Sequence, residues 1–212
     1  MTKKKKMLLA VSTVLIVTII TGVLIAYFAN KDDEPNLITV GEDDIEVTEV
    51  FTPPKQTDEF KYRKLVKIKN TGSIPCYVRV RLEFSNSDVE GVASFSAANQ
   101  GDNDTEPDDN TFKSAQIKKG TNYYINNLPD GWVYVWEEST VDPIVTNGYY
   151  YYTKAIDPNE ETNALISWIK MDYDSTLPSA HDVFVYSESV QTVDPNTGTV
   201  YTDWKAAWNS FG

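Results

Sequence analysis

The chain has 212 residues, a formal net charge of −12, one cysteine and one histidine. Beyond its first few residues it has no basic cluster, so we expect no nucleic-acid binding, which needs a Lys/Arg patch to neutralise phosphates. One cysteine excludes an intramolecular disulfide and a cysteine-based zinc site, and one histidine excludes two-histidine metal motifs. Hydrophobic residues make up 41% of the chain, which predicts one folded, acidic domain.

Residues 1–26 have the pattern of a secretory signal peptide. The lysines Lys3–Lys6 precede an uncharged, mainly apolar run from Met7 to Ala29. Such a run enters the bilayer while the positive cluster stays on the inner side. The small Ala26 ends the apolar core, which predicts cleavage between Ala26 and Tyr27. Because the run is also about as long as a membrane span, an uncleaved anchor remains the alternative.

Downstream of Pro35 the apolar residues alternate with polar ones, which is typical of strands with one buried and one solvated face. The clearest example places Val78, Val80 and Leu82 on one face. Turn residues such as Asn147-Gly148 bound these runs. The ranges predicted as strands are 45–51, 60–69, 77–84, 132–136, 148–154, 164–171 and 182–190. The side chains predicted to face the core are Ile45, Val47, Phe51, Phe60, Tyr62, Val66, Ile68, Val78, Val80, Leu82 and Phe84, whereas Lys61, Arg63, Lys67, Lys69, Tyr77, Arg79, Arg81 and Glu83 are predicted to face water.

The end of the chain changes to a helical period. Trp204, Ala207, Trp208 and Phe211 are spaced i, i+3, i+4 and i+7, and Asp203 is placed to cap the first turn. At least seven short strands without a long intervening helix favour two antiparallel sheets packed face to face. We therefore predict an all-β sandwich with a short C-terminal helix.

The stretch from about 85 to 119 matches no element, and it is predicted to be a mobile acidic surface insertion. Carboxylates at this spacing can surround a hard cation such as calcium. Pro107 stands beside the position where a calcium-binding hand needs glycine, and Lys113 occupies the place of its closing glutamate. A solvated loop and a weak calcium site both remain open, and no cofactor is predicted. The candidate ligands are Asp102, Asp104, Glu106, Asp108 and Asp109.

Three further features have a structural and a functional interpretation each. Cys76 is either a small buried residue or a thiol that crosslinks two chains in an oxidising compartment. His181 lacks the second imidazole of a zinc peptidase and is interpreted as an ordinary loop histidine, with no catalytic residue assigned. A set of aromatic residues is either cross-strand packing or a platform for stacking sugars. Its members are Trp132, Tyr134, Trp136, Tyr149, Tyr150, Tyr151 and Tyr152.

Several of these segments together resemble the TasA/camelysin family of secreted bacterial matrix-fibre proteins. The segments are the lysine-rich start, the signal end Ala26-Tyr27-Phe28-Ala29-Asn30-Lys31-Asp32, the stretch Val66 to Val80, the run Gly148 to Tyr152 leading to Asp157-Pro158-Asn159-Glu160-Glu161-Thr162, and Ser189-Val190-Gln191 followed by Ala206-Ala207-Trp208. The resemblance implies a jelly-roll sandwich, export processed by a dedicated SipW-type signal peptidase, and self-assembly through an N-terminal strand donated to the next subunit. Camelysin-like relatives are also classed as metallopeptidases.

The sequence and the resemblance together predict a secreted structural subunit of an extracellular fibre or biofilm matrix. Its parts are a signal peptide (1–26), an extended segment (27–44) and a sandwich domain (45–212) with the insertion at about 85–119. Its partners are copies of itself and other matrix subunits, and it meets the membrane transiently through the signal. The donated strand is expected to be 45–51 or the segment 27–40, in which Leu37, Ile38 and Val40 enter the neighbour's pockets. A secreted metallopeptidase and a glycan-binding adhesin are the alternatives.

Overall fold

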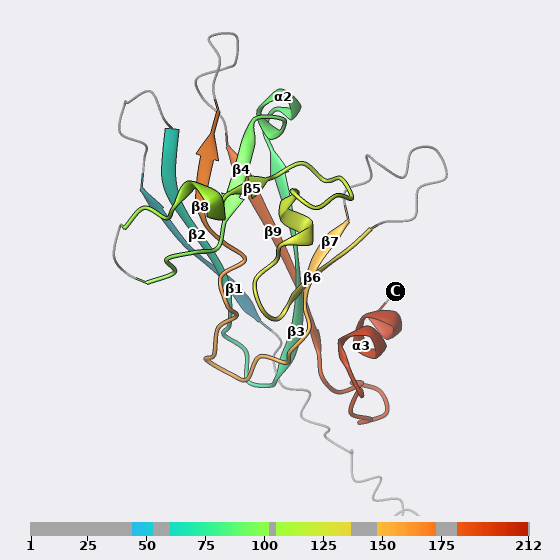
Figure 1. The fold of residues 1–212 in the computed structure, drawn as a ribbon. Helices are drawn as coiled ribbons and strands as arrows, with labels where there is room; N and C mark the ends of the chain where they lie inside the picture. Colours follow the sequence, from blue (N-terminus) through green and yellow to red (C-terminus); the bar gives the residue numbers. More distant parts are fainter. Residues whose placement is uncertain (1–43, 53–59, 102–104, 137–147, 173–181, 212) are drawn as a thin grey trace, which may run out of the picture. The chain divides into compact units, whose positions relative to one another are not determined.

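The computed structural model describes residues 44–52, 60–101, 105–136, 148–172 and 182–211 (Figure 1). The predicted signal peptide, its cleavage site at Ala26 and Tyr27, and the assembly residues Leu37, Ile38 and Val40 lie outside these ranges. His181, Asp102 and Asp104 lie outside them as well. No helix within the described part of the chain is long and apolar enough to span a membrane.

The described residues form two antiparallel sheets packed against each other, which confirms the predicted all-β sandwich (Figure 1). The five-stranded sheet has the order β1 (Ile45–Thr52), β2 (Phe60–Asn70), β8 (Ile166–Met171), β4 (Ala93–Ser96) and β5 (Lys113–Ser114). The four-stranded sheet has the order β6 (Trp132–Val135), β7 (Tyr149–Tyr152), β3 (Cys76–Phe84) and β9 (Val183–Gln191). The helices are α2 (Ser87–Glu90), α3 (Trp204–Phe211) and the 3₁₀ turns η1 (Asp109–Thr111) and η2 (Tyr124–Asn126).

The core lies between the two sheets and contains the inward faces of the alternating strands. Val66 and Ile68 of β2, Val78 and Val80 of β3, and Ile169 of β8 are all 0% exposed. Burying one such side chain stabilises the fold by roughly 1.5–3 kcal/mol, so this face decides the register of each strand. The seven ranges predicted as strands thus match β1, β2, β3, β6, β7, β8 and β9 to within two residues at either end.

The exposure of two residues at one end of the first hairpin differs from expectation. Phe51 of β1 is 56% exposed and contacts Tyr62 edge-on, with 5.8 Å between ring centroids. The pairing of β2 with β8 shifts between Arg63 and Val66, which is the mark of a β-bulge. Arg63, predicted to face water, is 3% exposed because the chain around Gly101, whose carbonyl accepts a hydrogen bond from the Arg63 guanidinium, covers it.

The stretch 85–119 contains structure that the sequence interpretation missed. β4 pairs with β8 inside the five-stranded sheet, and its residues Ala93 and Phe95 are each 1% exposed. Asn86 caps α2 by accepting a 2.8 Å hydrogen bond from the backbone N–H of Asp88. The acidic middle of the stretch does lie at the surface, but its flanks are parts of the sandwich rather than a mobile insertion.

The C-terminal helix forms as predicted and changes which residues meet solvent. Asp203 caps α3 by accepting a 2.9 Å hydrogen bond from the N–H of Ala206. The helix packs on the outer face of the four-stranded sheet, where Tyr77 and Trp208 are each 8% exposed (Figure 1). Tyr77 and Arg79 therefore lie under a helix, whereas the alternation alone placed them in water.

Candidate functional sites

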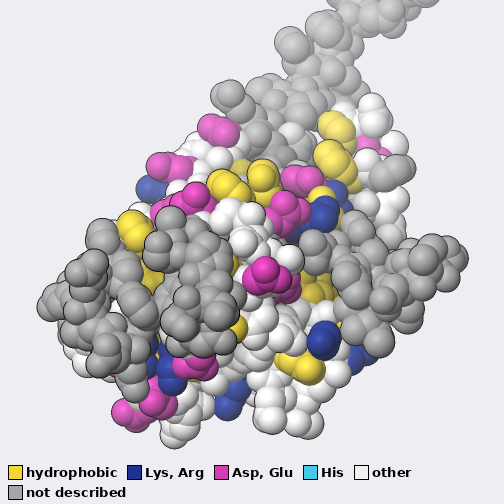
Figure 2. Space-filling view, turned by 90° about the horizontal axis from the view of Figure 1, so that it is seen from above, with side chains coloured by type: hydrophobic (Ala, Val, Ile, Leu, Met, Phe, Trp, Pro, Cys, Tyr) yellow, Lys and Arg dark blue, Asp and Glu magenta, His cyan; other side chains and the backbone are white. Residues whose placement is uncertain are grey.

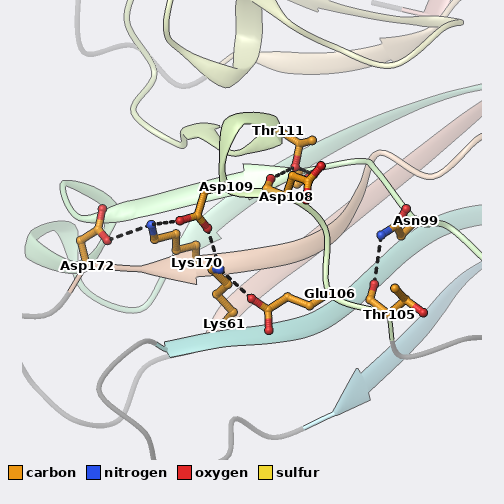
Figure 3. Close-up of polar contacts among 10 residues, drawn as sticks. Lys61, Asn99, Thr105, Glu106, Asp108, Asp109, Thr111, Lys170 and Asp172 are labelled. Carbon is orange, nitrogen blue, oxygen red and sulfur yellow. Dashed lines mark hydrogen bonds and ion pairs between the residues drawn. The ribbon is translucent and has the colours of Figure 1, made fainter.

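The acidic segment, here residues 97–101 and 105–111, lies on the outer face of the five-stranded sheet. The Lys61 ammonium is 2.6 Å from a Glu106 carboxylate oxygen and 2.6 Å from one of Asp109 (Figure 3). Lys170 of the neighbouring strand is 3.7 Å from both Asp109 and Asp172. Lys61 and Lys170 are register partners on β2 and β8, so the sheet itself places the two ammonium groups side by side.

The ion pair between Lys61 and Asp109 shifts the pKa values of both groups. Hydrogen bonds to Asp109 and then Glu106 raise the pKa of Lys61 above its usual range. The hydrogen bond from Lys61 lowers the pKa of Asp109, and the charge of Lys170 lowers it further. The Lys61 side chain is 9% exposed, while the carboxylates of Glu106 and Asp109 are more than half exposed. A buried cation thus holds two surface anions.

Glu106 and Asp109 therefore contact lysines rather than converging on an empty cation position. Asp108 lies apart, and its backbone carbonyl accepts a 2.7 Å hydrogen bond from the Thr111 hydroxyl (Figure 3). Within the described ranges no group of three or more His, Cys, Asp or Glu side chains is arranged to hold a metal ion. Calcium binding through the predicted set stays a prediction, because Asp102 and Asp104 lie outside those ranges.

Polar contacts attach the rest of the acidic segment to the sheet. Arg63 donates a 2.6 Å hydrogen bond to the carbonyl of Gly101, and the Ser167 hydroxyl donates one of 2.5 Å to the carbonyl of Ala98. Trp168, the register partner of Arg63, is 6% exposed beneath the segment. This segment therefore covers the outer face of β2 and β8 with polar groups.

An arginine organises the opposite outer face, where α3 packs on the four-stranded sheet. The Arg79 guanidinium lies 4.2 Å from the ring centroid of Tyr149 and 4.3 Å from that of Trp208. Its Nε donates a 2.6 Å hydrogen bond to Glu188, and a terminal nitrogen donates one of 3.3 Å to the Tyr151 hydroxyl. A planar cation between two rings is a favourable arrangement that lysine cannot reproduce.

The aromatic residues proposed from the sequence divide between the two faces of the four-stranded sheet. Trp132, Tyr150 and Tyr152 are less than 8% exposed and face the core. Tyr134 packs edge-on against Tyr150, with 4.8 Å between ring centroids. On the outer face, Tyr149 and Tyr151 contact Arg79, and Tyr151 also contacts the two α3 tryptophans. The arrangement favours the packing interpretation, because few of these rings are open to a sugar.

Cys76 is 0% exposed at the start of β3. Its backbone N–H and carbonyl bond to Ile156, at 3.1 and 2.8 Å. A thiol in this position cannot reach another chain while the domain is folded, so an intermolecular disulfide does not fit the folded domain and the interpretation as a small buried residue does.

The sandwich has long open edges on one side. β1, of eight residues, and β9, of nine, end their sheets, and no other described strand pairs with their outer edges. The opposite edges, β5 and β6, are two and four residues long. Val50 and Phe51 of β1 and Phe184 and Tyr186 of β9 are 41–56% exposed. Long edges with exposed apolar side chains are templates for a further strand.

The family models, the curated proteins and the solved structures include no match to this chain. Sequence reasoning missed the lysine partners of the acidic residues and the aromatic contacts of Arg79. The lysine partners had a detectable signal in the sequence. Lys61 and Arg63 lie on the same face of a predicted strand, and the acidic run of the chain needs cations to balance its charge.

Proposed function

We propose that this protein is a secreted structural subunit that assembles with copies of itself into an extracellular fibre. The observation that carries the proposal is the pair of long open edges, β1 and β9. An open edge presents unpaired backbone N–H and C=O groups, and an extended segment from a neighbouring subunit satisfies them by adding a strand.

The register of β1 narrows the choice of donated segment. All eight residues of β1 pair with β2, from Ile45 opposite Asn70 to Thr52 opposite Arg63. Asp44 continues this pairing, since its carbonyl accepts hydrogen bonds of 3.0 Å from the N–H groups of Thr71 and Gly72. Donating β1 to a neighbour would break its own sheet. The segment 27–40, which precedes β1 in the chain, is therefore the donor that we propose.

Leu37, Ile38 and Val40 supply the apolar side chains of this donor, and the signal peptide is removed at Ala26 and Tyr27 before assembly. The chain carries a net charge of −12, and removal of the four N-terminal lysines makes it more negative. Subunits therefore repel one another at long range. Added salt shortens the Debye length from ~30 Å at 0.01 M to ~10 Å at 0.1 M, so assembly is faster at higher ionic strength.

The test compares the exported protein with a variant that lacks residues 27–43. This deletion keeps Asp44, whose carbonyl contacts the turn after β2. The full protein forms filaments in electron micrographs, and the deleted variant stays monomeric in analytical ultracentrifugation while its circular dichroism remains that of the folded sandwich. Filaments formed equally well by the deleted variant would rule out the donor segment and place the contact on the sandwich itself.

A matched variant separates the loss of apolar side chains from the loss of chain length. Leu37→Asp, Ile38→Asp and Val40→Asp together keep the segment but remove what fills the neighbour's pockets. This variant is expected to remain monomeric, whereas Asp32→Asn and Asp33→Asn together are expected to assemble faster than the unchanged protein.

A further inference from the structure

A cavity of about 230 Å³ opens where β3, β4 and α2 meet at one end of the sandwich. Phe84 and Phe95 line it with stacked rings, whose centroids are 5.7 Å apart and whose planes differ by 7°. The apolar part of the wall also includes Leu82, Ile117, and the residues Ala115 and Tyr150, which are each 2% exposed. Figure 2 looks onto the end of the domain that carries α2, where acidic side chains lie among apolar ones.

The two carboxylates on this wall differ in their ionic contacts. Glu90 of α2 lines the cavity, and burial raises the pKa of its carboxyl group, against a smaller opposing effect of the Ile117 backbone N–H and of the Lys118 charge. Among the described residues, no ion pair joins Glu90 to a lysine or arginine. The second carboxylate on the wall, Glu83, is already 2.8 Å from the Arg81 Nε.

We infer that this cavity binds a short primary aliphatic amine. The ammonium group contacts Glu90 and replaces the water that the carboxylate has lost, while the alkyl chain lies against Phe84 and Phe95. A liquid water occupies ~30 Å³, so the cavity suits a ligand of about five to seven heavy atoms. The negative charge of the chain also attracts cations toward the opening of the cavity.

The experiment titrates the full exported chain with n-pentylamine at pH 7 and follows it by NMR. The methyl signal of Ala115 and the ring signals of Phe95 are expected to shift with saturation. Glu90→Gln keeps the shape of the side chain and removes its charge, and it is expected to weaken binding at least tenfold. The matched control is Glu160→Gln, an exposed glutamate outside the cavity wall, which is expected to leave the affinity unchanged.

Neutral 1-pentanol has the same chain without the ammonium group, and it is expected to bind at least tenfold more weakly than the amine. Equal affinities of the alcohol and the amine would overturn the proposal, since the cavity would then be an apolar void. Unchanged binding by Glu90→Gln, or shifts confined to residues outside the cavity, would overturn it too. Binding of a lysine peptide without binding of n-pentylamine would mean that the occupant is another protein. None of these results depends on fibre assembly.

Discussion

The two outer faces of the sandwich are covered in opposite ways. On the five-stranded sheet, the acidic segment is attached by ion pairs and hydrogen bonds to Lys61, Arg63 and Lys170. On the four-stranded sheet, α3 is attached by its tryptophans, which pack on Tyr77, Tyr151 and Arg79. Apolar burial scales with area and is insensitive to salt, whereas exposed ion pairs are weak and screened. The helix is therefore the strongly held cover and the acidic segment the weakly held one.

Removing the central ring of the strongly held cover is expected to have the largest effect. Trp208→Ala removes a side chain that is 92% buried, as its 8% exposure implies, together with its contacts to Tyr151 and Arg79. Truncating a buried tryptophan typically costs about 3–5 kcal/mol. Urea denaturation measures this loss. Phe211→Ala is the matched control, because Phe211 belongs to the same helix but is 61% exposed, and its effect is expected to stay within about 1 kcal/mol.

A more conservative change tests whether the guanidinium itself holds the helix. Arg79→Lys keeps the charge but loses the planar stack between Tyr149 and Trp208, and its expected cost is about 1–2 kcal/mol. Arg81→Lys on the same strand serves as the control, with an effect below about 0.5 kcal/mol. If both variants unfold at the same urea concentration, the stack contributes nothing beyond its charge.

The strand pattern explains why the sandwich could be predicted and the covers could not. Alternation identifies a strand when three or more apolar residues define a face, as in β1 and β3. β4 escaped because Ala93 and Phe95 alone mark its inner face and a glycine precedes it. The sequence of β3 does not indicate that α3 packs on it. Arg79 was therefore predicted to face solvent, because it alternates with the core residues. Which segment covers the outer face of a sheet depends on tertiary packing, so the sequence period alone cannot predict it.

The acidic segment shows the same difficulty for sites. Its carboxylates are close together in the sequence, and this spacing predicted a cation site. Their cations come from Lys61 and Lys170, which lie on two strands far apart in the chain. The cavity at Glu90 also depends on three separate elements. Arguments from spacing cannot find sites that are assembled from distant segments. They did find the cap at Asp203, because its hydrogen bond joins residues only three positions apart.

The weakly held cover is expected to respond to salt. Lys61→Met fills the same buried space without charge and removes the ammonium group that contacts Glu106 and Asp109. Its effect on the denaturation midpoint is expected to be smaller than that of Arg79→Lys, and hydrogen exchange at the Thr111 and Phe112 amides is expected to speed up. Sodium chloride at 0.5 M weakens protection of these two amides in the unchanged protein but not in Lys61→Met. Lys154→Met, which breaks the exposed pair with Asp130, is the control and leaves both amides unchanged.

The smallest expected effect is the pH dependence of the same contact. The pKa of Asp109 is lowered in the folded state, so its pairing stabilises the fold fully above the ordinary aspartate value of about 3.9 and loses this contribution as the pH falls through the lowered value. The difference in unfolding free energy between the unchanged protein and Lys61→Met should therefore be constant from about pH 5 to pH 8 and shrink below about pH 4. Carboxylates that do not contact Lys61 titrate alike in both proteins and cancel in this difference. The corresponding difference in unfolding free energy for Trp208→Ala is set by apolar packing and should change little over the acidic range. A parallel decrease of the two differences would show that the two covers are not held by different forces.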